Sequence, residues 1–169
     1  SARVMKKTGA GGIKLEGGAE MASTVRFLVE RGIPVLGHIG LRPQQVHVMG
    51  GYKVQGKTED QIEQLKQDAK AIEEAGAFAI VVEGTLEHVS RDITQHLTIP
   101  TIGIGASPAC DGQILVTEDV LGITPGAKAK FVKAYANLYH DADNALQNLA
   151  ADVKARRFPG PENLYLKTK

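Results

Sequence analysis

The sequence predicts an α/β protein built on a parallel β-sheet. Apolar, β-branched runs alternate with segments of helical periodicity, and the runs close on glycine. Four such β-then-α units follow one another, at a spacing that calls for parallel strands joined by right-handed crossovers. Two architectures satisfy this pattern, an open doubly wound sheet or part of a (βα)8 barrel. In both, functional side chains gather at the carboxyl ends of the strands.

The expected strands are the apolar runs themselves. They cover residues 11–18, 33–40, 78–84 and 99–106. The third run is apolar on both faces, as a parallel strand covered by helices should be. Residues 111–116 follow the fourth run without room for a full helix, and they leave two possibilities open, a fifth strand or an apolar turn.

Helical periodicity fills the segments between the strands. Residues 19–31, 58–75 and 86–96 place apolar side chains on one helical face. Thr58 and Gln61 form the sequence pattern of a capping box, so we expect the second of these helices to begin there.

Both ends of the chain show helical features as well. Residues 1–10 have the character of the last turns of a helix, with basic residues ahead of Gly9. Residues 128–155 are predicted to be helical, and the tail over residues 156–169 is predicted to be irregular. The helical prediction rests on an apolar stripe formed by Phe131, Val132, Tyr135, Leu138, Leu146, Leu149 and Val153.

Composition narrows the functional classes. The chain has 169 residues, which is the size of one domain, and a formal net charge of +1. That charge gives no electrostatic reason to expect a nucleic-acid or anionic-membrane partner. No run of about 18 apolar residues or signal-peptide pattern occurs. Cys110 is the only cysteine, so we expect no internal disulfide and a cytoplasmic protein.

Charged side chains stand at the ends of three expected strands. Lys14 and Glu16 are two residues apart and therefore point to the same side of their strand, while His38 and Glu83 end the second and third strands. Two carboxylates on one rim can divide the work between holding a divalent cation and acting as a base. The simpler alternatives are a surface ion pair at Lys14 and Glu16, a core histidine at His38, and a helix N-cap at Glu83.

Three other features carry weaker signals. No second histidine lies at ligand spacing from His38, so a zinc site is not expected. Gly103 and Gly105 follow a strand, but no helix begins at the distance that a dinucleotide site needs. Residues 41–57 form a long polar loop of the kind that is usually functional or mobile, and Lys53 within it is free to close over an anion or to stay solvated.

Several motifs together resemble the ketopantoate hydroxymethyltransferase family. They occur in family order at residues 14–18, 37–41, 50–56, 102–106 and 111–116, and the GGYKVQG stretch is the most specific of them. The resemblance implies a (βα)8 barrel of the superfamily that includes phosphoenolpyruvate mutase and isocitrate lyase. It also implies that this chain corresponds to the later part of that barrel, with a partial (βα) barrel domain over 1–155 and a tail over 156–169. The family's earlier strands carry two metal-binding aspartates and a substrate-binding serine that this sequence does not contain.

The resemblance also assigns roles to individual positions. Glu16 matches the family's magnesium-binding glutamate, and Glu83 stands where the family has its catalytic base. The family often has a cysteine and then a proline soon after that base, whereas Gly84 and Thr85 follow it here. A second departure is Ser107, which stands where a glycine is more usual. The positions that match contacts to the ketoacid substrate are Lys14, His38, Ile104 and Ile114.

The reaction that the resemblance implies is a magnesium-dependent one-carbon transfer. A hydroxymethyl group passes from 5,10-methylenetetrahydrofolate to 3-methyl-2-oxobutanoate, which yields ketopantoate in pantothenate biosynthesis. A second interpretation is another magnesium-dependent 2-oxoacid lyase or mutase of the same superfamily, and a third is a catalytically inert fragment. The family further implies a homo-oligomer whose partners are small molecules rather than nucleic acid or membrane.

Overall fold

The computed structural model describes residues 1–45 and 53–166. The chain divides into two compact units, Ser1–Ile114 and Leu115–Lys169, and each unit is described by itself. The motif over residues 50–56 lies partly outside the described residues. No helix in the described part of the chain is long and apolar enough to cross a bilayer.

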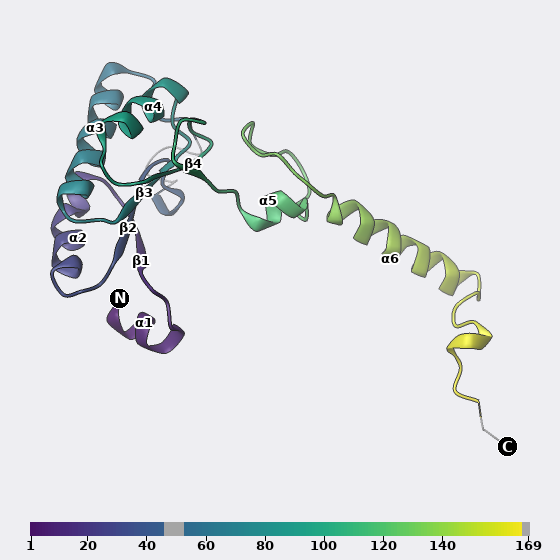
Figure 1. The fold of residues 1–169 in the computed structure, drawn as a ribbon. Helices are drawn as coiled ribbons and strands as arrows, with labels where there is room; N and C mark the ends of the chain where they lie inside the picture. The colour runs from purple at the N-terminus through teal and green to yellow at the C-terminus, as the bar shows by residue number, and fades with distance from the viewer. Residues whose placement is uncertain (46–52, 167–169) are drawn as a thin grey trace. The chain divides into compact units, whose positions relative to one another are not determined.

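The first unit is built on a five-stranded parallel sheet (Figure 1). Its strands follow chain order, and each pairs with the next one along the sequence. A doubly wound sheet reverses its strand order at a switch point, so this uninterrupted order is that of a barrel wall. Residues 111–116, left open by the sequence, supply the short fifth strand. The strands are β1 (Ile13–Glu16), β2 (Val35–Gly40), β3 (Ala79–Glu83), β4 (Thr101–Ile104) and β5 (Gly112–Gln113).

Helices α2 (Ala22–Val29), α3 (Glu59–Glu74) and α4 (Glu87–His96) cover one face of this sheet (Figure 1). The core between sheet and helices is aliphatic, because alternate residues of β2 and β3 point to this side and meet one apolar stripe from each helix. Its fully or nearly fully buried members are Val25, Val35, Ile39, Leu65, Ala69, Ile72, Ala75, Ala77, Ile80, Val82, Val89 and Ile93.

The other face of the sheet carries the charged side chains. Glu16 pairs in register with His38, which pairs with Val81, and Glu83 pairs with Ile104. Residues paired across parallel strands point to the same side, and side chains alternate along a strand. These side chains therefore share the face that the helices do not cover, at the carboxyl ends of β1 to β4.

The helix ends follow the predicted chemistry with one change of partner. At the start of α3, the Thr58 hydroxyl accepts the Gln61 N–H at 3.3 Å, as the capping pattern predicts. The Gln61 side chain does not close back on Thr58, since its Oε1 accepts the Lys57 N–H at 2.9 Å instead. Helix α1 (Ala2–Thr8) ends at Gly9 with φ of 71°, which confirms the expected glycine stop.

One predicted helix and all four predicted strands are longer than the elements that form. The helix expected over 19–31 divides into a 3-10 turn, η1 (Ala19–Met21), and α2. Each of the four predicted strands begins one or more residues late, and β2 starts only after Pro34, whose missing N–H suits it to the strand's entrance. A second 3-10 turn, η2 (Pro43–Gln45), follows β2.

The second unit corrects the prediction of a helix over 128–155. Its helices are α5 (Thr117–Leu121) and α6 (Leu138–Lys154), and residues 128–137 are not helical. The Tyr135 and Ala136 N–H groups donate to the Val120 carbonyl at 2.8 and 3.2 Å. The segment is thus bonded to the end of α5, and these N–H groups do not form the bonds of a continuous helix. One short 3-10 turn, η3 (Pro161–Asn163), lies in the tail, and residues 156–160 and 164–166 form no helix or strand.

Candidate active site

The centre of the candidate site is His38, which is 1% exposed and lies between two carboxylates. Its Nδ1 is 3.5 Å from Glu16 Oε1, and its Nε2 is 3.1 Å from Glu83 Oε2. Among the described residues, neither ring nitrogen has a partner in good hydrogen-bond geometry. Buried polar atoms are nearly always hydrogen-bonded, so such an exception favours a site kept for function over one built for stability.

Glu16 is the last residue of β1, and the turn after β1 holds its backbone in place. Gly17, at φ of 136°, donates its N–H to the His38 carbonyl at 3.0 Å, which ties the end of β1 to β2. The Glu16 side chain is only 10% exposed, and its Oε2 accepts the Gln44 backbone N–H at 3.4 Å. The carboxylate is therefore nearly enclosed while its backbone is fixed by the neighbouring strand.

Glu83 is fixed through its own carbonyl. That carbonyl accepts the Leu41 N–H at 2.8 Å and the Thr85 hydroxyl at 3.0 Å. Gly40, at φ of 88°, allows the end of β2 to lie this close, because a Cβ there would collide with the Glu83 carbonyl oxygen. The side chain is 14% exposed. A base needs this combination of fixed backbone and partial access.

The remaining candidates lie around these three side chains. Lys14 is exposed and shares the face of Glu16, two residues before it. Ile104 is buried at the end of β4, in register with Glu83. Ile114 is 47% exposed just after β5, where its N–H donates to the Gly103 carbonyl at 3.0 Å. The structure thus brings Glu16, His38 and Glu83 together by measured distances. It places Ile104 and Ile114 at the carboxyl side of the sheet, whereas Lys14 lies nearer the amino end of β1, in register with Leu36.

The donor set of this chain fits magnesium only in part. Glu16 offers carboxylate oxygens, which are the ligands that Mg²⁺ prefers, and Mg²⁺ commonly uses one or two carboxylates together with water and substrate oxygens. Within residues 1–45 and 53–166, no group of three His, Cys, Asp or Glu side chains is arranged to hold a metal ion. The site therefore suits a cation that Glu16 helps to hold, and it does not form a complete cage.

Sequence reasoning missed two side chains that shape this site. Thr85 is 2% exposed and binds the Glu83 carbonyl, and Asp68 is 6% exposed and binds the turn after Glu16. A signal for Asp68 was present in the sequence, because it occupies the apolar stripe of α3 together with Leu65, Ala69 and Ile72. An acid at such a position has a specific partner more often than not.

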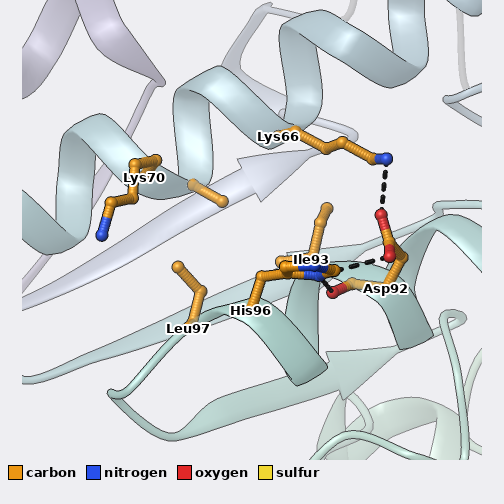
Figure 2. A pocket seen from close by; sticks show the side chains of 7 residues that line it. Lys66, Lys70, Asp92, Ile93, His96 and Leu97 are labelled. Atoms are coloured by element: carbon orange, nitrogen blue, oxygen red, sulfur yellow. Dashed lines mark hydrogen bonds and ion pairs between the residues drawn. The ribbon is translucent and has the colours of Figure 1, made fainter.

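A separate pocket lies in the outer helical layer, between α3 and α4 (Figure 2). It has a volume of about 230 Å³. Its floor is apolar, and the charges on its rim neutralise one another: Lys66 pairs with Asp92 at 2.5 Å and Lys70 with Glu73 at 2.9 Å. Nothing in this arrangement points to the chemistry of the site at the strand ends. The lining residues are Lys66, Ala69, Lys70, Asp92, Ile93, His96 and Leu97.

Comparison with known proteins decides the family. A family model described as ketopantoate hydroxymethyltransferase matches residues 1–161. The chain belongs to this family. Its fold is of the (βα)8 barrel type, to which the five parallel strands of this chain contribute part of the wall.

Curated relatives carry the same family name in fuller form. The chain is 56% identical over 163 residues to a protein of Rhizobium rhizogenes and 58% identical over 165 residues to one of Sinorhizobium medicae. Both are named 3-methyl-2-oxobutanoate hydroxymethyltransferase. The alignments cover 96% and 98% of this chain but only 60% of each relative, so the chain spans somewhat more than half of their length.

Proposed function

We propose that the full-length protein transfers a hydroxymethyl group from 5,10-methylenetetrahydrofolate to 3-methyl-2-oxobutanoate, forming ketopantoate. The observation that carries this proposal is the convergence of Glu16, His38 and Glu83 at the carboxyl ends of three adjacent strands, with distances of 3.5 and 3.1 Å from His38 to the two carboxylates. Family membership supplies the reaction class, and the relatives' names supply the acceptor.

In this proposal Glu83 is the base. Its carboxylate takes the proton from C3 of the 2-oxoacid, while the two hydrogen bonds to its carbonyl keep the backbone fixed. Water first adds to the methylene carbon of the folate, whose two C–N bonds break to leave tetrahydrofolate and a carbon at the oxidation level of formaldehyde. The C3 carbon then forms a bond to that carbon, and its oxygen takes up a proton to become the hydroxyl group of the product.

Two charged residues support that proton transfer. Glu16 would hold Mg²⁺, and a cation there would withdraw charge from the 2-oxoacid and so acidify its C3–H bond. The Lys14 ammonium group neutralises the negative charge that develops on the substrate oxygen. His38 lies between the two carboxylates and orients them, and Ile104 and Ile114 provide apolar contacts to the substrate's branched end.

The dependence on folate tests this proposal. The full-length protein should convert 3-methyl-2-oxobutanoate to ketopantoate only when 5,10-methylenetetrahydrofolate and Mg²⁺ are both present, as followed by mass spectrometry of the product. Conversion of the 2-oxoacid without folate would instead support a lyase or mutase. For site variants measured in this assay, Glu74→Gln is a suitable control because Glu74 is exposed on α3 and its side chain is 61% accessible.

A second candidate, an inert chain, applies to these 169 residues when they are tested alone. It is favoured by the absence of a three-donor metal cluster in the described ranges. Turnover and Mg²⁺ dependence of the 169-residue chain, measured beside the full-length protein, separate the two. We expect turnover from the longer polypeptide and none from the shorter one.

A further inference from the structure

We propose that Asp68 is a positioning residue for Glu16, and that it acts by fixing the turn that follows β1. Asp68 comes from the middle of α3, yet its Oδ1 accepts the Ala19 N–H at 2.9 Å across 49 positions of sequence. Ala19 is the first residue of η1 and stands three residues after Glu16. This inference rests on the proposed function, in which Glu16 holds the divalent cation.

The environment of Asp68 argues for a specific role. The residue is 6% exposed, and within the described residues its carboxylate forms no ion pair with a cation. Its bonds run to the Ala19 N–H and to the Gln64 side-chain amide, which donates to Oδ1 at 2.8 Å. A buried carboxylate is costly, and an apolar residue at this point of the α3 stripe would pack more simply. The acid is thus explained by the backbone group that it binds.

Gly18 leaves the space that the Asp68 carboxylate occupies. A Cβ at Gly18 would collide with the carboxyl carbon and both carboxyl oxygens of Asp68. The carboxylate therefore lies directly against the backbone of the turn. This close approach couples the path of residues 17–19 to the position of α3.

The turn is pinned on both sides of Gly18. On one side, the Gly17 N–H donates to the His38 carbonyl at 3.0 Å. On the other, the Ala19 N–H is bound by Asp68, while the Gly18 N–H donates to the exposed Glu20 at 3.1 Å. Loss of the Asp68 bond leaves the first orphan N–H of η1 without its buried acceptor and lets the peptide after Glu16 move. Supporting groups of this kind typically change metal affinity by about 10–100-fold.

The test measures Mn²⁺ binding to the full-length protein without substrate, by the electron paramagnetic resonance signal of the free ion. Asp68→Ala should weaken binding by about 10–100-fold. Asp68→Asn keeps an oxygen acceptor for the Ala19 N–H and should restore binding nearly to wild type. Hydrogen exchange of the metal-free protein gives an independent readout, because the Ala19 amide should exchange faster in Asp68→Ala and not in Asp68→Asn.

The matched control is Glu73→Gln on the same helix. Glu73 binds the Thr98 N–H in the same manner, but at the entrance of β4, at the opposite end of the sheet from Glu16. The Glu73→Gln variant should leave Mn²⁺ binding unchanged. Should Asp68→Ala not fold, Gly18→Ala provides the second variant, because its added Cβ would collide with the Asp68 carboxylate and push it away from the turn, and it should weaken Mn²⁺ binding as well.

The outcomes separate this inference from the proposed function. Unchanged Mn²⁺ affinity in Asp68→Ala, or in Gly18→Ala when the former does not fold, overturns the positioning role. An equal loss in Glu73→Gln overturns it too, because the effect would then be one of general stability. If Glu16→Gln itself retains full Mn²⁺ affinity, the metal-binding part of the proposed function fails, and the role of Asp68 fails with it.

Discussion

The two ends of the sheet use their acidic side chains in different ways. At the amino ends, Glu73 Oε1 accepts the Thr98 N–H at 2.5 Å and its hydroxyl at 2.8 Å, and Asp111 Oδ2 accepts the Thr101 N–H at 2.8 Å. At the carboxyl ends, Glu16 and Glu83 flank a buried histidine whose ring nitrogens lack well-formed hydrogen bonds among the described residues. The amino ends are thus built for stability, and the carboxyl ends are left available for chemistry.

The pKa shifts at the amino ends agree with this division. Burial alone raises the pKa of Glu73, but the hydrogen bonds from Thr98 and the ion pair with Lys70 outweigh it and lower the pKa to about 2. The hydrogen bonds from the Thr101 backbone and hydroxyl lower the pKa of Asp111. Both carboxylates are therefore held as anions by the fold.

The largest expected effect on kcat/KM is on the face of the sheet that carries Glu16, where Lys14→Ala should lower kcat/KM of the full-length protein by about 10²–10³-fold. The reason is the loss of positive charge where the substrate oxygen becomes negative. The melting temperature should stay within a degree or two, because Lys14 is exposed. Lys130→Ala, an exposed lysine of the second unit, is the matched control. Full activity in Lys14→Ala would show that Lys14 does not take part in the reaction.

The reverse pattern is expected at the amino ends, where Glu73→Gln should lower the free energy of unfolding by about 1–3 kcal/mol. The Thr98 N–H and hydroxyl lose a charged acceptor, and kcat/KM should not change. Urea denaturation provides the measurement, with the exposed neighbour variant Glu74→Gln expected to cost less than about 0.5 kcal/mol. A Glu73→Gln protein that keeps its stability but loses activity would break the comparison between the two ends.

The dependence of this stability on pH sharpens the same comparison. Since the pKa of Glu73 is lowered on folding from 4.5 to about 2, its contribution is present above about pH 4.5 and is lost as the pH falls toward 2. The difference in unfolding free energy between wild type and Glu73→Gln should therefore shrink as the pH is lowered from about 5 to about 2. A difference that stays constant over this range would show that the carboxylate's charge is not the cause.

The smallest expected effect is that of Asp111→Ala, which should cost about 1 kcal/mol of unfolding free energy. Asp111 is exposed, so water can replace part of the hydrogen bonding that its carboxylate provides to the Thr101 N–H and hydroxyl. Thermal denaturation followed by circular dichroism is sufficient to detect the loss. If Asp111→Ala lost more unfolding free energy than Glu73→Gln, the order expected from the greater burial of Glu73 would be wrong.

The sequence predicts the first unit well because its signals are local. Apolar runs closing on glycine locate β1 to β4, and periodicity locates α2 to α4. Periodicity fails over 128–137, where an apolar stripe is present but the Tyr135 and Ala136 N–H groups bond to Val120 instead. That choice depends on a contact between separate segments, which no local pattern encodes.

The candidate site likewise has residues that the sequence predicts and a residue that it does not. Parallel strands bring their carboxyl ends to one edge, so Glu16, His38 and Glu83 could be expected together from the sequence. The role of Asp68 could not, because its contact with Ala19 joins residues 49 positions apart. Only its place in the apolar stripe of α3 marked it as unusual.

The most direct test of the central claim is exchange of the C3 proton of 3-methyl-2-oxobutanoate with deuterated water, followed by NMR in the full-length Glu83→Gln variant. If Glu83 removes that proton, the exchange rate should fall by about 10²–10⁴-fold while the melting temperature stays unchanged. Exchange near the wild-type rate would contradict the account, since the proton would then leave to a group other than the carboxylate at the end of β3.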